Sequence, residues 1–405
     1  MVFTSAALAA FAIAAPTIAS AASNGAPAAA KTAAPNPPAA IASGAVATAA
    51  ASHDISGIVG ADSIAALQTP PPPEPAFNGT PPLLFNGSGG AADCVFAPCD
   101  NGDVMMTQAT GPLTITPIFW DPAGHAMSPQ YKEIITRYLH DVALASGQDS
   151  NVFSVLNEYY GNNGQIHYNV RLGTPVNDTN PLPADGCALA ANDTTGIYAD
   201  GSGYNACLDD AQLQAEIQTV TTARDLPDNL SNIYVLYTPK AVESCFNPGS
   251  TTSTAGGQFC TINHQPTAAY CAYHSTTTYS AVYANLSYPI YASPVGFTCG
   301  SDARYPVVES PNHNPDADTE ISPTSHEVSE AITDPDTETG WYDSTGNEIG
   351  DDCAYIYGAT NGQAGALYNQ TIIGQHFITQ QEFSNNVFSA SGGTAGCVDS
   401  QAAEG

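Results

Sequence analysis

The ten cysteines of this chain constrain its fold more than any other feature of the sequence. Their number is even and no C-x-x-C motif occurs, which favours disulfides in an oxidising compartment over a thiolate zinc site. Sequence alone leaves the connectivity open. The spacing indicates pairs between neighbours: Cys94 with Cys99, Cys187 with Cys207, Cys245 with Cys260, Cys271 with Cys299, and Cys353 with Cys397.

The N-terminal region predicts export. The apolar run Ala6–Ala15 is followed by the small residues Ala19-Ser20-Ala21, so we interpret residues 1–22 as a secretory signal peptide. Residues 23–92 are rich in Ala and Pro and are expected to form a disordered linker or pro-segment. No later apolar run is long enough to predict a membrane span. We therefore expect a secreted, extracellular protein with one globular domain over residues 93–400.

The charge balance narrows the range of partners. The chain has 7 Lys and Arg against 38 Asp and Glu, a net charge of −31. This excess argues against binding to nucleic acid or to anionic membrane surfaces. It suits a protein secreted into acid, where many carboxylates are protonated and few cations remain to repel one another. We expect the partner to be an extracellular polypeptide or a cell-wall component, and the oligomeric state is not predicted.

Helix and strand patterns alternate along the middle of the chain. Leu113–Trp120 predicts a strand, which Pro117 would place at an edge or a bulge. Ser128-Pro129 opens a helix with apolar residues at helical spacing, and Asp209 or Asp210 caps another. Ile233–Tyr237 is continuously apolar and predicts a central strand. With an irregular part after residue 340, this order predicts a single α/β or α+β domain.

Residues 325–336, SHEVSEAITDPD, hold the densest run of candidate metal ligands. Ser322-Pro323 predicts the start of a helix and Pro335 its end. His326 and Glu330 are four residues apart and share one helix face, where they can hold a metal ion, while Glu327 can polarise a bound water. The metalloprotease motif HExxH has this arrangement, with a second His where Glu330 stands. The alternative is a carboxylate-rich helix favoured by the helix dipole.

A metal site on this helix needs a third ligand. Asp336 lies ten residues after His326, at the position of the third ligand in the long metalloprotease motif, although the Gly of that motif is absent. Asp351, Glu348 and His274 are the other candidates. We expect zinc, and calcium or manganese becomes competitive if two carboxylates bind.

Two further alternatives concern the substrate and the chemistry. Trp341 and Tyr342, with His274, are candidates for substrate binding, whereas the alternative is that the two aromatic residues form a buried lid over the helix end. A carboxylate pair that acts without metal, Glu327 with a second acid, stays open because protonation of His326 in acid would release a metal. No G-x-S-x-G elbow occurs and every cysteine has a candidate partner, so serine and thiol nucleophiles are disfavoured.

Three blocks resemble the Exordium-like, phosphate-induced family of secreted proteins. They are ITPIFWD…SPQYKEIITRYL, CAYHS…YSAVYANL, and SHEVSEAITDP…GWYDSTGNEIGDDCAYIYG, with a closing FITQQEFSNN…GCV. The likeness covers roughly Leu113 to Val398. The resemblance implies a cell-wall-associated protein in plants or a secreted protein in microbes, without an established reaction. The Ala-rich leader and the acidic balance look microbial, so the growth-regulating role of plant members is not carried over.

Together these observations predict a zincin-like single domain with a mixed sheet, a metal-site-like helix and an irregular disulfide-bonded C-terminal part. The predicted function is a secreted metal-dependent hydrolase, first of all a peptidase. His326, Glu330 and one of Asp336 or Asp351 would hold the metal, and Glu327 would be the general base. The alternative is a non-catalytic extracellular binding protein of the Exordium-like family.

Overall fold

The structure, a computed structural model, describes most of the chain from Pro82 onwards. The predicted signal peptide, most of the predicted linker and the predicted pair Cys94–Cys99 lie outside the described residues. Those residues are 82–86, 102–107, 111–189, 193–198, 200–245, 260–261, 270–277, 280–289, 299, 309–336, 339–344 and 346–404.

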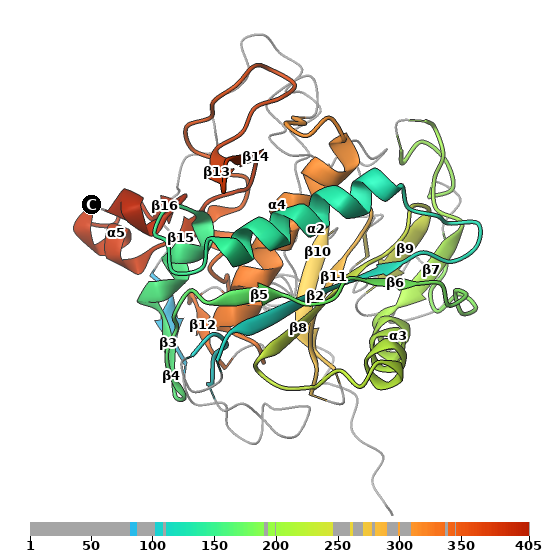
Figure 1. Ribbon diagram of the computed structural model, residues 1–405, viewed down its shortest axis with the longest axis horizontal. Helices are drawn as coiled ribbons and strands as arrows, with labels where there is room; N and C mark the ends of the chain where they lie inside the picture. Colours follow the sequence, from blue (N-terminus) through green and yellow to red (C-terminus); the bar gives the residue numbers. More distant parts are fainter. Residues whose placement is uncertain are drawn as a thin grey trace, which may run out of the picture. The chain divides into compact units, whose positions relative to one another are not determined.

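A six-stranded mixed sheet forms the centre of this part of the chain (Figure 1). Strand β10 runs antiparallel to β11, and the other neighbours run parallel. The predicted central strand is confirmed as β8, which lies between β11 and β2. In order across the sheet the strands are β10 (Ala272–Thr276), β11 (Val282–Leu286), β8 (Asn232–Tyr237), β2 (Leu113–Trp120) and β5 (Val170–Leu172), with β6 (Val176–Asp178) also paired to β2.

The sequence predicts that Pro117 marks an edge or a bulge of strand β2. The edge is wrong because β2 lies inside the sheet, and no bulge interrupts its register with β8. On one side β8 pairs with residues 114–119 of β2. On the other side β5 pairs with residues 113–115 and β6 with residues 118–120. Pro117 lies where the partner strand changes from β5 to β6. The Leu113 N–H donates to the Asn169 carbonyl beside β5, so the backbone nitrogens of the odd-numbered residues of β2 face β5 and β6. The missing N–H of Pro117 therefore leaves no ladder bond unmade.

Helices cover both faces of the sheet (Figure 1). Helices α2 (Pro129–Leu144) and α4 (Pro315–Thr333) pack on one face, and α3 (Asp210–Ala223) packs on the other. The caps of α2 and α3 are confirmed, because Ser128 accepts from the Tyr131 N–H and Asp209 forms a capping box with Gln212.

Alternate residues of each strand divide between the two faces. In β10, Ala272 belongs to the core on the α4 side and Tyr273 to the core on the α3 side. His274 therefore faces α4. The alternation of side chains along β10 therefore places His274 on the face of the sheet that packs against the helix with the HEVSE sequence.

Helix α4 begins eight residues before its predicted start, so the prediction that Ser322 caps it is wrong. Asn314 is the N-cap, with its side chain accepting from the Ala317 N–H at 3.1 Å, and Pro315 occupies the first turn. Pro323 lies inside the helix. Asn314-Pro315 and Ser322-Pro323 are both signals for the start of a helix, and α4 begins at the first of them. The helix ends at Thr333, two residues before Pro335 as predicted.

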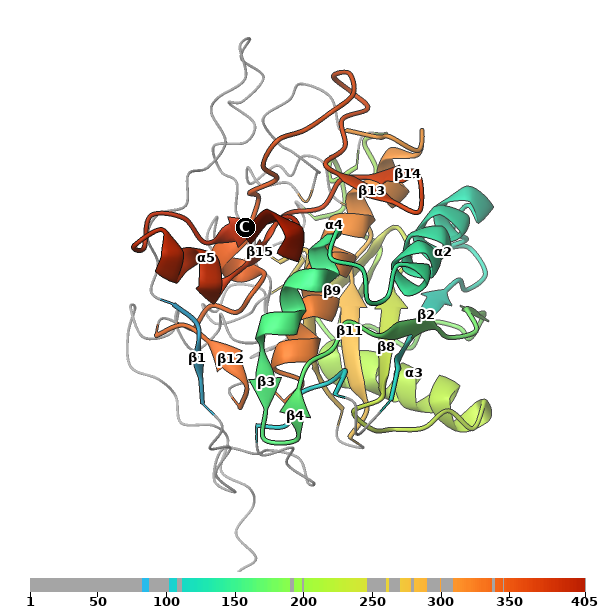
Figure 2. The same cartoon turned by 60° about the vertical axis from the view of Figure 1, so that its left-hand side comes forward.

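The C-terminal part consists of short elements that lie along α4, with β14 near its start and β12 near its end (Figure 2). Strand β1 lies in the segment predicted to be a linker, yet it pairs with β12 of this part. The elements are β1 (Leu84–Phe85), β12 (Trp341–Tyr342), η2 (Asp351–Cys353), β13 (Gln370–Ile372), β14 (Gln375–Phe377), β15 (Glu382–Phe383), α5 (Asn385–Ala390), β16 (Cys397–Val398) and η3 (Gln401–Glu404).

The remaining short elements flank the sheet. They are η1 (Val152–Glu158), the hairpin β3 (Tyr160–Gly161) and β4 (Gly164–Gln165), and the parallel pair β7 (Ala206–Asp209) and β9 (Val242–Cys245). Of these, η1 is a 3-10 helix that Asn151 caps by accepting from the Phe153 N–H. Among the described helices, none is both long and apolar enough to cross a membrane.

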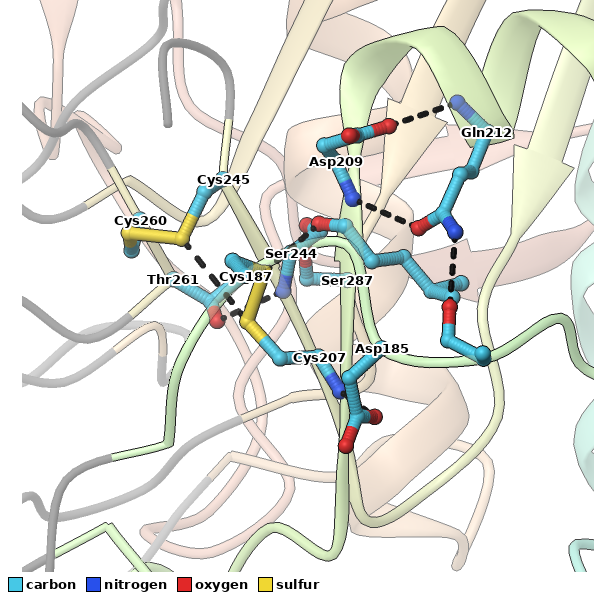
Figure 3. The surroundings of a disulfide bond; sticks show 12 residues. Asp185, Cys187, Cys207, Asp209, Gln212, Ser244, Cys245, Cys260, Thr261 and Ser287 are labelled. Carbon is cyan, nitrogen blue, oxygen red and sulfur yellow. Dashed lines mark hydrogen bonds between the residues drawn. A yellow bond between two sulfur atoms is a disulfide. The ribbon is translucent and has the colours of Figure 1, made fainter. Parts of the chain in front are cut away.

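Four predicted disulfides are confirmed: Cys187–Cys207, Cys245–Cys260, Cys271–Cys299 and Cys353–Cys397. The first two lie side by side because β7 and β9 are paired, with the Sγ atoms of Cys207 and Cys245 only 3.9 Å apart (Figure 3). The bond Cys353–Cys397 joins η2 to β16 and so fixes the loop that contains Asp351.

Candidate metal centre

Helix α4 is enclosed by protein along most of its length. It packs against α2, η1 and strands β8, β10 and β11, and every residue from Ala317 to Thr333 except Pro323 is buried. Its apolar residues, such as Val328 and Ile332, fill the core beside the sheet. Its polar residues are therefore carried into the interior as well, among them the whole HEVSE sequence.

The first group of ligand atoms lies around His326. Its Nε2 is 2.9 Å from Glu330 Oε1 and 3.7 Å from Asp351 Oδ1. The Asp351 N–H also donates to Glu330 Oε1 at 3.1 Å, which positions the carboxylate. His326 and Glu330 share a helix face because they are four residues apart, and Asp351 reaches them from η2.

The second group lies around His274 on β10. Its Nε2 donates to the Asp334 carbonyl at 3.1 Å, because a carbonyl oxygen can only accept. Its Nδ1 lies 3.4 Å from Glu327 Oε2 and 3.6 Å from Glu330 Oε2. Glu348 lies on the other side of the ring, with Oε1 3.7 Å from Nε2.

Two residues of the C-terminal part hold the His326 ring. The Gln380 side-chain amide lies 2.6 Å from His326 Nδ1 and donates to the Gly350 carbonyl at 2.8 Å. A Cβ atom on Gly350 would come within 2.6 Å of the same ring nitrogen. Residue 350 is therefore a glycine because the imidazole packs directly on its backbone.

A fifth carboxylate, Glu382 on β15, faces the same interior. Burial, together with the charges of Glu330 and Asp351, raises its pKa well above the usual range, against the opposing effect of His326. Sequence reasoning missed this residue. Its only signal was its place in the closing FITQQEFSNN block, where a charged residue stands beside Phe383.

Most polar side-chain atoms of the cluster formed by these residues have no hydrogen-bond partner in the described part of the chain. The members of the cluster are His274, His326, Glu327, Glu330, Glu348, Asp351 and Glu382. Within the described residues, His274 Nδ1, His326 Nε2, Glu330 Oε2 and both oxygens of Glu327, Glu348 and Glu382 have no hydrogen-bond partner. No described lysine or arginine forms an ion pair with it, since those that do pair contact Asp121 and Asp200. Buried polar atoms are normally satisfied, so this set indicates a missing cationic partner.

The pKa values show how the cluster behaves when protons are the only cations. Burial opposes the charged form of both rings, yet Glu348 raises the pKa of His274 well above the usual range and Glu330 does the same for His326. Burial also opposes ionisation of Glu330, but the two imidazoles lower its pKa to about 2. For the other acids burial dominates and raises the pKa of Glu327, Glu348 and Asp351. The cluster therefore retains protons unless another cation replaces them.

The structure thus brings together the predicted residues His326, Glu327 and Glu330 with three of the candidate third ligands, Asp351, Glu348 and His274. His274, predicted to bind substrate, lies inside the cluster. Asp336 lies past the end of α4. Among the described residues, the histidine-containing groups whose ligand atoms lie within 4.8 Å of one another are His274 with Glu330 and Glu348, and His326 with Glu327 and Glu330, so Asp336 is in neither.

Trp341 does not line a groove, in contrast to its predicted role in substrate binding. It is 8% exposed, packs against the rings of Phe85, Tyr159 and Tyr160, and donates to the Tyr160 carbonyl at 2.6 Å. Tyr342 is half-buried beside it in β12. Both residues join β1 and β12 to the core, as in the alternative interpretation of a buried aromatic lid.

The chain matches no protein-family model, and no curated protein or solved structure is significantly similar to it. The resemblance to the Exordium-like family therefore stays a prediction.

Proposed function

We propose that this protein is a secreted metal-dependent hydrolase, first of all a peptidase, with its metal centre on the zincin-like helix α4. The observation that carries the proposal is the convergence of Glu330 Oε1 and Asp351 Oδ1 on His326 Nε2, at 2.9 and 3.7 Å, where no described lysine or arginine forms an ion pair with either carboxylate. An imidazole and two carboxylates form a donor set that zinc accepts, and manganese is the competing ion.

Two residues of the site have separate proposed roles in hydrolysis. A zinc ion bound here would supply Lewis acidity toward a carbonyl oxygen and toward water. Glu327 follows His326 in the sequence, and neither of its carboxylate oxygens has a hydrogen-bond partner among the described residues. Burial raises its pKa, which makes it a better proton acceptor near neutral pH than an exposed glutamate. We therefore assign Glu327 as the general base and Gln380 as the residue that orients the His326 ring.

A digest of casein across pH 3–8 tests the proposal, with wild type, Glu327→Gln and Asp318→Asn compared at equal concentration. Asp318 is a buried acid on the same helix that is hydrogen-bonded by Ser310 and Asn312 rather than by the cluster. We expect activity in wild type and in Asp318→Asn, and a loss of about 10²–10⁴-fold in Glu327→Gln. Equal activity in Glu327→Gln, with metal still bound, would remove Glu327 from the mechanism.

Complete burial favours a second candidate function. The side chains of His274 and His326 are 0% exposed and that of Asp351 is 13% exposed. A structural ion is normally enclosed by its ligands, whereas a catalytic ion keeps a position open for substrate. In this second candidate the protein is a non-catalytic extracellular binding protein of the Exordium-like kind, and its metal only stabilises the fold. It predicts that Glu327→Gln changes stability and leaves the biological effect intact.

A further inference from the structure

The two carboxylate oxygens of Glu330 face two different imidazoles. Oε1 lies 2.9 Å from His326 Nε2, and Oε2 lies 3.6 Å from His274 Nδ1. The two rings come from different elements, α4 and β10, on the same side of the sheet. A carboxylate that directs one oxygen to each of two ligand groups has the arrangement of a bridge between two cations.

Each ligand group has the dimensions of a metal site. Metal–ligand distances of about 2.0–2.2 Å place neighbouring ligand atoms of a tetrahedral site about 3.3–3.6 Å apart. Around His326 the separations are 2.9 Å to Glu330 and 3.7 Å to Asp351. Around His274 the Nδ1 atom is 3.6 Å from Glu330 Oε2, the Nε2 atom is 3.7 Å from Glu348 Oε1, and His274, Glu330 and Glu348 each offer a ligand atom within 4.8 Å of the others. The second group is therefore comparable to the first.

The hydrogen bonds of the His274 ring suit metal binding. Metal-binding histidines usually donate their second ring N–H to a carboxylate or a backbone carbonyl, which fixes the tautomer. His274 Nε2 donates to the Asp334 carbonyl, which leaves the Nδ1 lone pair of the neutral ring directed at Glu327 and Glu330. Nδ1 is fully buried and has no hydrogen-bond partner in the described part of the chain.

The His326 ring needs one adjustment that the His274 ring does not. The nitrogen of the Gln380 amide faces Nδ1 of His326. Binding of a metal at Nε2 places the ring proton on Nδ1, so the Gln380 amide must then present its oxygen instead. The Gly350 carbonyl would lose its donor in that orientation. The His274 group is thus the better prepared of the two.

The charge of the cluster also indicates two cations. Its carboxylates are Glu327, Glu330, Glu348, Asp351 and Glu382, which are all buried or nearly so. If all are ionised, one divalent ion leaves 5 − 2 = 3 negative charges in the interior, whereas two leave 5 − 4 = 1. Uncompensated buried charge is costly, so the second ion removes most of the remaining penalty.

We propose that the cluster holds two divalent cations bridged by Glu330. His326 and Asp351 bind the first cation, and His274 and Glu348 bind the second. The mixed nitrogen and oxygen ligands suit zinc or manganese. This inference rests on the proposed metal centre and adds a second site to it, with Glu327 beside both.

Metal stoichiometry of the full-length secreted protein tests the inference. The protein is treated with a chelator, dialysed at pH 7 against buffered zinc and measured by elemental analysis. We expect two zinc ions per chain in wild type and in the control Asp318→Asn, and one in His274→Ala. Glu348→Gln is a second variant for the same site and keeps the volume of the side chain, in case His274→Ala does not fold. One ion in Glu348→Gln supports the inference as well.

A spectroscopic readout distinguishes a bridged pair from two separate ions. In protein loaded with manganese, wild type is expected to show the electron paramagnetic resonance of a coupled pair, and Glu348→Gln that of an isolated ion. One ion per chain in wild type that is lost in His326→Ala overturns the second site and leaves the proposed function standing. No bound ion in wild type overturns both. Two ions without coupling overturn the bridge.

Discussion

Helix α4 carries two sets of buried acids that differ in how their charge is accommodated. In its first half, Asp318 accepts from the Ser310 hydroxyl and from both the backbone and the side chain of Asn312. In its second half, Glu327 faces only other titratable side chains, and neither of its oxygens is hydrogen-bonded within the described structure. One helix therefore contains both a carboxylate with three hydrogen bonds and one, Glu327, with none among the described residues.

The rest of the first half follows the same pattern. Asp316 accepts from the Tyr288 hydroxyl and Glu320 from the Tyr131 hydroxyl, although the other oxygen of Glu320 has no partner. Neutral hydroxyl and amide donors are enough to hold an acid in a protein interior. Donors of this kind could have been placed around Glu327 as well. No such donor contacts Glu327 among the described residues, which supports the proposed cation in the second half.

Removal of metal should produce the largest change in stability, and the change should arise from the second half of α4. At pH 7, a chelator should lower the melting temperature of wild type by about 5–10 °C, because an ion at 100 times its dissociation constant stabilises by about 2.7 kcal/mol. Readdition of zinc should restore it. Thermal denaturation followed by circular dichroism measures the change, and the same shift is expected in Asp318→Asn. An unchanged transition would show that the second half needs no cation.

Gly350→Ala should weaken metal binding with little effect on the first half of α4. The added Cβ would overlap His326 Nδ1, so the ring must move away from Glu330 and Asp351. Loss of a residue that orients a metal ligand typically costs about 10–100-fold in affinity. Zinc titration by calorimetry checks this. An affinity equal to that of wild type would mean that the ring position does not matter for binding.

Neutralising one acid in each half should give opposite results in metal-free protein. Asp318→Asn replaces a carboxylate that accepts three hydrogen bonds by an amide. The free energy of unfolding should therefore fall by about 1–3 kcal/mol. Glu348→Gln removes a buried charge without donors, so its stability at pH 8 should equal or exceed that of wild type. Urea denaturation with chelator present measures both. Destabilisation by both substitutions would remove the distinction between the two halves.

Trp341→Phe should have the smallest effect on the metal centre. The substitution removes the hydrogen bond to the Tyr160 carbonyl and part of the packing on β1, so a stability loss of about 1–2 kcal/mol is expected. Metal stoichiometry should not change, because Trp341 is not one of the cluster residues. Elemental analysis of the variant checks this, and loss of an ion would extend the site to β12.

Local patterns were sufficient to predict much of the fold. The apolar run at Ile233–Tyr237, the Ser128 cap and four disulfide pairs follow from hydrophobic periodicity, capping chemistry and spacing along the chain. The start of α4 was mispredicted because Ser322-Pro323 repeats the signal of Asn314-Pro315. The sequence cannot rank two such signals, since packing against α2 and the sheet decides how far the helix extends.

The sequence singled out the helix residues of the site, and it offered Asp351, Glu348 and His274 only as alternatives for one further ligand. His326, Glu327 and Glu330 follow from the i, i+4 spacing, and Asp351 followed as one of several alternatives. Glu382 and the Gln380 amide come from β15 and the loop before it, more than 50 residues away in sequence. Only the folded C-terminal part brings them to α4, so no local pattern marks them.

The sign of the pH dependence follows from the raised pKa values. A group whose pKa is higher in the folded than in the unfolded state stabilises below its unfolded pKa, and that contribution is lost as pH rises through the folded value. The directions for His274, His326, Glu348 and Asp351 are all upward, so the metal-free protein should become less stable from acid to alkaline pH. Glu330 is the exception, with its pKa lowered to about 2.

The central claim is that cations replace protons in this cluster as pH rises, and the most direct test is the stability of wild type with and without chelator at pH 4 and pH 8. Protons compete with metal at acid pH, so the two urea midpoints should coincide at pH 4. At pH 8 the chelator should lower the midpoint, and zinc should restore it. Coincident midpoints at both pH values would contradict the account, because the buried acids would then be tolerated without metal.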